Sequence, residues 1–73
     1  MRYFILGGTG FVGQSLIPFL LQKGHDVDVL IRDPAQEELF PGSCSCHQGD
    51  PLHPGPWQEQ AGQAEVIVNL VGK

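Results

Sequence analysis

Tyr3-Phe4-Ile5-Leu6-Gly7-Gly8-Thr9-Gly10-Phe11-Val12-Gly13 is the stretch of sequence that decides the fold. Its apolar start predicts a buried strand, and glycines at every third position from 7 to 13 allow a sharp turn and close approach of a charged ligand to the backbone. The segment that follows reads as a helix, whose N-terminus offers free N–H groups and partial positive charge to a phosphate. A glycine loop between a strand and a helix, with a second strand beyond, is typical of a dinucleotide-binding site.

The rest of the chain alternates predicted strands and helices. We expect strands at residues 2–6, 25–31 and 43–48 and from residue 65 or 66 onward, a long helix at 10–23, and short helices at 35–40 and 57–63. Pro18 should bend the long helix, and Gly24 should end it in a left-handed conformation. Such alternation predicts an α/β protein: the N-terminal part of a Rossmann doubly wound parallel sheet, with strand order 3-2-1-4 and a ligand at the carboxyl ends of the strands.

Composition narrows the class of protein. The chain has 73 residues and a net charge of −4, which suits one small domain and argues against a nucleic-acid surface. No apolar run is long enough to cross a membrane, no signal peptide is recognised, and two cysteines are too few for a secreted disulfide framework, so we expect a cytoplasmic protein. The apolar segment 66–71 resembles a central strand but lies next to the last residue, Lys73. We therefore expect residues 1–73 to be a partial domain of a longer protein, one that dimerises or aggregates when isolated.

The three glycines have separate expected roles. Gly7 would make the tight turn, Gly10 would let a pyrophosphate approach, and Gly13 would let the helix pack closely on the strand. The backbone N–H groups of Phe11 and Val12 are the expected phosphate donors. The alternative is a glycine-rich turn that binds nothing.

Four segments resemble one protein family. They are Gly7–Gly13, Gly24-His25, Gly49-Asp50-Pro51-Leu52 and Val68-Asn69-Leu70-Val71-Gly72. Together with Trp57 they resemble the extended and atypical short-chain dehydrogenases/reductases, and most of all the NAD(P)-dependent nucleoside-sugar epimerase-like proteins. Leu6 stands where this family usually has threonine, which leaves the backbone role of the loop intact.

The resemblance implies roles for further residues. Asp50 should contact the adenine amino group, and Val71 and Gly72 should lie beside a ribose of the cofactor. An alternative for Asp50 is a turn residue that caps the proline-rich loop. Relatives that prefer NAD carry an acidic residue at the end of the second strand, where this chain has Ile31 followed by Arg32. Because a guanidinium suits a 2′-phosphate, we predict NADP as cofactor. NAD is the alternative, since a shift of one residue would bring Asp33 to the ribose.

The resemblance also implies a reaction that this segment cannot complete. Catalysis in the superfamily relies on a Tyr-x-x-x-Lys pair, and Tyr3 is followed four residues later by Gly7. We therefore assign no catalytic residue and expect the acid/base groups to lie beyond this chain. The parent would be an NAD(P)-dependent oxidoreductase or epimerase acting on a nucleotide sugar or another small molecule. A non-catalytic structural or sensor protein that binds NAD(P) is the alternative.

The remaining polar and aromatic residues favour structural interpretations. Cys44 and Cys46 should face one side of a strand and His47 the other, so we predict small thiols that fill space and no metal site. Trp57 should anchor the short helix on the sheet. His53 should be exposed and inert, and Asn69 should bond the nearby backbone.

Overall fold

The computed structural model describes residues 1–71. Along the chain it contains β1 (Arg2–Leu6), α1 (Phe11–Gln22), β2 (Asp26–Ile31), the 3₁₀-helix η1 (Pro34–Leu39), β3 (Ser45–Gln48), α2 (Trp57–Gly62) and β4 (Val66–Asn69). The elements match the predicted order, and their boundaries differ from the predicted ones mainly at the ends of the short helices and of β3. Gly72, which was expected beside the cofactor, lies outside the described residues.

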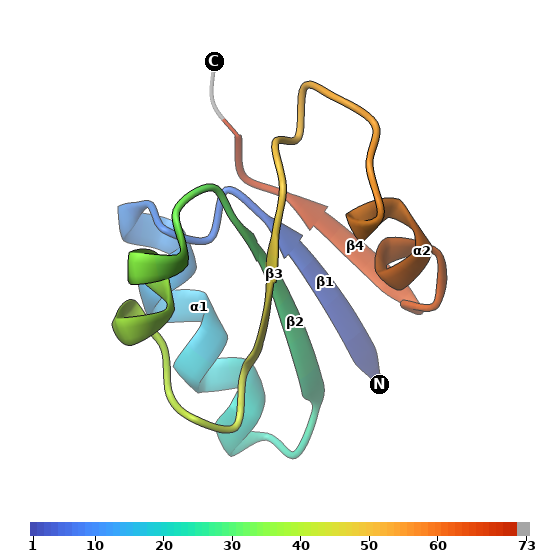
Figure 1. Ribbon diagram of the computed structural model, residues 1–73. Coiled ribbons are helices and arrows are strands. Elements are labelled where there is room, and N and C mark those ends of the chain that lie inside the picture. The colour runs from blue at the N-terminus through green and yellow to red at the C-terminus, as the bar shows by residue number, and fades with distance from the viewer. Residues whose placement is uncertain (72–73) are drawn as a thin grey trace.

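The strands form one parallel sheet in the order β3-β2-β1-β4 (Figure 1), which confirms the predicted Rossmann topology. Ile5 pairs with Val29 on one side and with Val68 on the other. This register aligns the carboxyl ends of β1, β2 and β4 at one edge of the sheet. The loops that leave those ends therefore meet in space.

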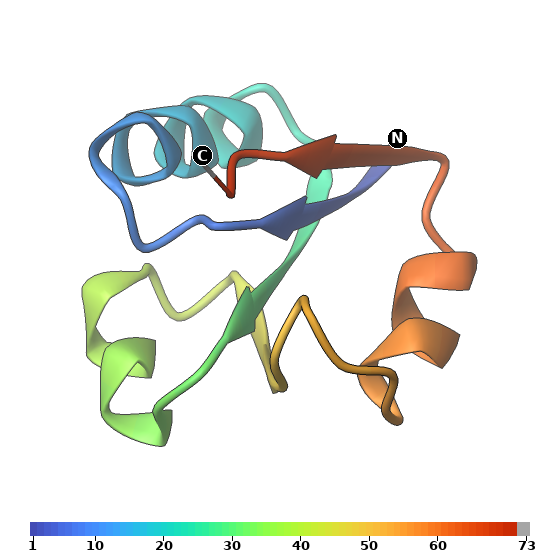
Figure 2. The same ribbon diagram turned by 90° about the horizontal axis from the view of Figure 1, so that it is seen from above.

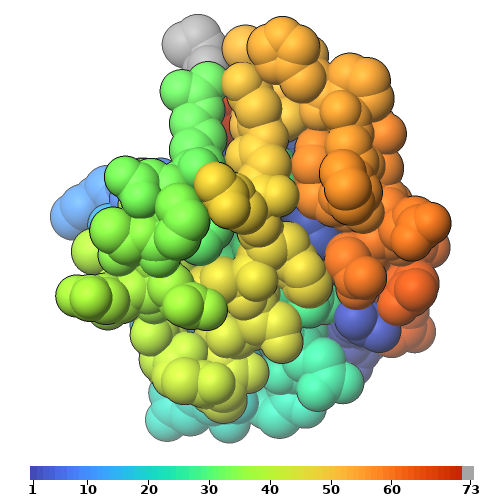
Figure 3. All heavy atoms as spheres, in the orientation of Figure 1, coloured from blue at the N-terminus to red at the C-terminus, as the bar shows by residue number. Residues whose placement is uncertain are grey.

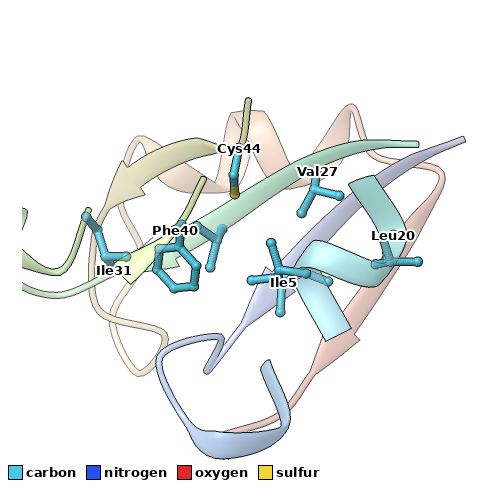
Figure 4. Close-up of a cluster of buried hydrophobic side chains, with 8 residues drawn as sticks. Ile5, Leu20, Val27, Ile31, Phe40 and Cys44 are labelled. Carbon is cyan, nitrogen blue, oxygen red and sulfur yellow. The ribbon is translucent and has the colours of Figure 1, made fainter. Parts of the chain in front are cut away.

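Helices cover both faces of the sheet. Viewed from above, α1 and η1 lie on one side and α2 on the other (Figure 2). Alternation along the strands divides the core accordingly, because successive side chains point to opposite faces. One cluster, on the α1 side, contains Ile5, Ile17, Leu20, Val27, Val29, Ile31, Phe40 and Cys44 (Figure 4). The other, on the α2 side, is built on Phe4, Leu30 and Ala61.

The ends of α1 agree with the sequence. Gly10 is its N-cap, and Gly24 follows its C-terminus with φ of +87°, the left-handed conformation expected there. Pro18 lies inside the helix. Within residues 1–71 the sheet covers only one side of α1, and Phe11, Val12 and Phe19 are exposed.

A buried carboxylate joins three strands, and the sequence analysis did not anticipate it. Asp28 of β2 is 4% exposed. Its Oδ2 accepts a hydrogen bond from Nε of Arg2 in β1 at 3.0 Å, and its Oδ1 lies 2.9 Å from Nε2 of His47 in β3. The two partners satisfy a charge that would otherwise be costly to bury.

Candidate functional site

A pocket of about 310 Å³ opens at the carboxyl edge of the sheet. Its lining brings together the loop after β1, the end of β2, the segment after β3 and the end of β4: Gly7, Thr9, Gly10, Leu30, Arg32, Gln36, Gly49, Pro51, Leu70 and Val71. The volume is at the lower end of the range usual for small-molecule sites. Of the predicted site residues, Gly7, Gly10, Arg32 and Val71 thus meet in one place, from three separate segments of the chain. The lining does not include Phe11, Val12, Gly13 or Asp50, although both sequence neighbours of Asp50 belong to it.

Gly7 makes the turn expected of it. Its φ is +79°, a conformation that other residues adopt only with strain. A Cβ at this position would also lie 2.7 Å from the backbone of Leu70 and Val71. Gly7 is therefore required both by its own conformation and by the close approach of β4.

Gly13 lets α1 pack on the glycine loop. A Cβ there would lie 2.5 Å from the Cα of Gly8. Space around Gly10 is different, because a Cβ would meet only the carbonyl oxygen of Gly7, at an ordinary 3.6 Å. The φ of Gly10 is −76°, which any residue adopts. No contact within residues 1–71 thus requires glycine at position 10, although it lines the pocket.

The N-terminus of α1 points its free N–H groups into the same region. The first helical hydrogen bond runs from the N–H of Gln14 to the oxygen of Gly10 at 3.0 Å, so the amides of Phe11, Val12 and Gly13 precede the helical ladder. No side chain within residues 1–71 caps this end, and its first turn carries no acidic residue. The partial positive charge of the helix is therefore available to an anion.

Arg32 and Asp33, the two residues directly after β2, have different roles. Arg32 lines the pocket, and its side chain is 66% exposed. Asp33 instead begins η1, where its Oδ1 accepts the N–H of Ala35 at 3.0 Å. Gln36 Oε1 completes this capping box by accepting the N–H groups of Arg32 and Asp33. Asp33 is thus engaged in the cap, whereas Arg32 belongs to the pocket lining and has its guanidinium 3.6 Å from Asp50.

Asp50 lies at the rim, next to Gly49 and Pro51. Its Oδ1 accepts the N–H of Leu52 at 2.9 Å, as expected for a turn residue. Oδ1 also lies 3.6 Å from Nη2 of Arg32, and Oδ2 lies 3.2 Å from Nδ1 of His53. The N–H of Leu52, followed by His53 and Arg32, keeps the pKa of Asp50 below its ordinary value. His53 is exposed as predicted, but it is bonded to this carboxylate.

The end of β4 completes the pocket. Val71 lies in its lining beside Gly7. Asn69 Oδ1 accepts the N–H of Val71 at 3.0 Å, which confirms that Asn69 bonds backbone. This short bond holds the chain in place directly after the strand.

The other candidate residues have structural roles. Cys44 and Cys46 pack in the core on the α1 side, whereas His47 stacks on Phe4 on the opposite side. Trp57 also stacks on Phe4, with ring centroids 6.1 Å apart, and its Nε1 donates to the oxygen of His53. Trp57 therefore anchors α2, as predicted.

Sequence reasoning assigned no site role to six of the pocket residues: Thr9, Leu30, Gln36, Gly49, Pro51 and Leu70. Gln36 was the most accessible of them to prediction, since Asp33 followed three residues later by glutamine is a capping-box pattern. The others come to the pocket through the packing of segments far apart in the chain, which local sequence does not reveal.

Comparison with known proteins agrees with this geometry. The model of the NAD dependent epimerase/dehydratase family matches residues 3–73. The chain belongs to this family. Family membership accounts for the glycine loop, the parallel sheet and the pocket at its carboxyl edge. Within the part of the chain that the structure describes, no helix is sufficiently long and apolar to cross a bilayer.

Individual relatives cover the chain to different extents. The mouse (Mus musculus) epimerase family protein SDR39U1 is 30% identical over 73 residues, which is 100% of this chain and 21% of that protein. Anthocyanidin reductase from Vitis vinifera is 47% identical over 34 residues, or 47% of this chain and 10% of the reductase. The chain therefore spans a small part of the curated relatives that it matches.

A solved structure shows the same fold. The enzyme WbmG from Bordetella bronchiseptica, solved in complex with NAD, superposes with a TM-score of 0.81 at 24% identity. The match covers 100% of this chain and 25% of WbmG. The arrangement of strands and helices is thus shared with a quarter of the larger WbmG chain.

Proposed function

We propose that this chain is the dinucleotide-binding segment of an NAD(P)-dependent oxidoreductase or nucleoside-sugar epimerase-like protein. The observation that carries the proposal is Gly10, which lines the pocket although no contact with residues 1–71 requires a glycine there. A pyrophosphate lying against the backbone at this position supplies the missing reason, because a Cβ would occupy its place.

The chain's own groups would hold the dinucleotide as follows. The N–H groups of Phe11 and Val12 donate to the pyrophosphate at the positive end of α1. Asp50 reaches the adenine amino group, and Val71 and Gly72 lie beside a ribose. The nicotinamide ring, when bound, exchanges a hydride with the substrate.

We further propose that the cofactor is NADP, because the residue at the end of β2 that faces the pocket is Arg32. An acidic residue would favour NAD by bonding the ribose hydroxyls. Asp33, the nearest acidic residue along the chain, uses its carboxylate to cap η1. WbmG was solved with NAD, so the two proteins would differ in cofactor preference.

The catalytic residues and the substrate pocket lie outside these residues in this proposal. The substrate would be a nucleotide sugar or another small molecule, and the protein would act in the cytoplasm. A non-catalytic protein that binds NAD(P) as a structural or sensing element is the second candidate. Tyrosine and lysine spaced four apart in the parent protein would favour the enzyme.

Titration calorimetry with NADP and NAD tests the proposal. We expect the wild-type chain to bind both, with NADP bound more tightly. Gly10→Ala should weaken both affinities about tenfold or more, since it blocks the approach of the pyrophosphate. Thermal stability should fall only slightly, by about 1 kcal/mol or less, because alanine fits the backbone at this position but is a poorer N-cap than glycine.

Gly62→Ala is the matched control, since a Cβ at Gly62 meets no atom of residues 1–71 within 4 Å and this residue lies in α2, away from the pocket lining. It should leave both affinities unchanged. Wild-type protein that binds neither dinucleotide, or a Gly10→Ala variant that binds as tightly as wild type, would refute the proposal.

A further inference from the structure

The guanidinium of the pocket residue Arg32 already has a counter-ion. Nη2 of Arg32 lies 3.6 Å from Oδ1 of Asp50, and the two side chains are 66% and 35% exposed. This separation is longer than the 2.7–3.2 Å typical of a hydrogen bond. Arg32 is thus attracted to Asp50 without being locked to it.

Asp50 is the fixed member of this pair. Its Oδ1 accepts the N–H of Leu52 and its Oδ2 lies 3.2 Å from Nδ1 of His53, both within its own turn. For Arg32, in contrast, the hydrogen bonds are made by the backbone and not by the side chain. Its N–H donates to Gln36 Oε1 at 3.0 Å, and its carbonyl oxygen accepts Nε2 of Gln48 at 3.3 Å. Only the guanidinium can move between Asp50 and a ligand.

Arg32 and Asp50 belong to two segments that meet beyond the carboxyl ends of the strands. In Figure 3 the green chain after β2 lies directly beside the yellow chain that continues from β3. Gly49 and Pro51, on either side of Asp50, belong to the pocket lining, as does Arg32. A phosphate bound to Arg32 would therefore lie close to the carboxylate of Asp50.

We propose that Asp50 competes with the 2′-phosphate of NADP for the Arg32 guanidinium, and so limits the selectivity of the site for NADP over NAD. This inference rests on the proposed function of the pocket. The competition affects NADP alone, because NAD has a neutral hydroxyl at the same position of its ribose. Two anions that share one exposed cation each gain less than either would gain by itself.

Replacement of Asp50 by asparagine tests this competition. Asp50→Asn removes the charge but keeps a side-chain oxygen that can accept the N–H of Leu52, so the turn should persist. We expect the ratio of NADP affinity to NAD affinity to rise about two- to fivefold, which is the effect typical of an exposed ion pair. Adenosine 2′,5′-bisphosphate and 5′-AMP, which lack the nicotinamide half, should show the same change in ratio. Asp50→Ser, with a neutral oxygen of its own, serves if the asparagine variant unfolds.

A double-mutant cycle shows whether Asp50 acts through Arg32. In an Arg32→Ala background, Asp50→Asn should leave the affinity ratio unchanged. A rise of the same size in that background would mean direct repulsion of the phosphate and would overturn the proposal. A lower ratio in Asp50→Asn would overturn it too, since Asp50 would then position Arg32 for the phosphate. An equal loss of both affinities would mean that Asp50 acts only as an adenine contact or a turn residue, and would likewise overturn the proposal. Wild-type protein that binds neither dinucleotide would instead refute the proposed function, before any variant is compared.

Discussion

Gly7 lies against the peptide bond that joins Leu70 to Val71, where a Cβ built on Gly7 would stand 2.7 Å from both the carbonyl carbon of Leu70 and the nitrogen of Val71. The first turn of the chain and the end of its last strand are thus in contact across the sheet. Because a φ of +79° also disfavours any side chain, this one residue combines a local and a long-range requirement for glycine.

Gly7→Ala should therefore destabilise the fold by about 2 kcal/mol or more, since the left-handed conformation alone costs roughly 1–2 kcal/mol and the contact with β4 adds to it. Urea unfolding followed by circular dichroism measures this loss. Gly62→Ala, at a site with open space, should be neutral or stabilising. Equal stability of the two variants would contradict the described contact.

Asp28→Ala should destabilise the fold by about 3 kcal/mol, because it leaves Arg2 and the β3 residue His47 without their buried partner. The measurement is again urea unfolding at neutral pH. Asp26→Ala is the control, since Asp26 is exposed at the start of the same strand and should change stability by less than about 0.5 kcal/mol. Similar losses in the two variants would show that the three-strand cluster contributes nothing specific.

Because the thiol of Cys44 is buried, we expect the fold to lose stability at alkaline pH. Burial, assisted by Cys46, raises the pKa of the Cys44 thiol from 9.0 to about 12. Because the folded pKa is the higher one, this contribution to stability is complete below pH 9 and declines as the pH rises toward 12. Wild type should thus be less stable at pH 10 than at pH 7, and Cys44→Ala should show a smaller difference. An unchanged difference would contradict the assignment.

The open side of α1 predicts self-association of the isolated chain. Phe11, Val12 and Phe19 are 90%, 60% and 53% exposed and line a shallow apolar groove. Phe19→Gln should raise the dimer dissociation constant about tenfold or more in sedimentation analysis, because burial of one phenylalanine contributes about 1.5–3 kcal/mol. Leu39→Gln, at an exposed position of η1, is the control. A wild-type chain that sediments as a monomer would refute this prediction.

Much of the fold could be predicted because its causes are local. Alternating apolar residues such as Val27, Val29 and Ile31 specify a strand, and Gly24 specifies a helix end through its own backbone freedom. Parallel order then follows from short right-handed connections. The sequence predicted the type and bounds of the short helices less accurately. The segment predicted as a short helix at 35–40 is a 3₁₀-helix over Pro34–Leu39, and α2 ends at Gly62, one residue before its predicted end, since few local contacts fix such boundaries.

The sequence by itself determined the parallel sheet, the glycine loop and the helix N-terminus beside it, because backbone freedom and apolar periodicity are properties of neighbouring residues. Only the tertiary structure decided which side chains meet. It paired Arg32 with Asp50, and it buried Asp28 between Arg2 and His47. These choices depend on strand register and on competition among partners far apart in the chain, which no local pattern of residues encodes.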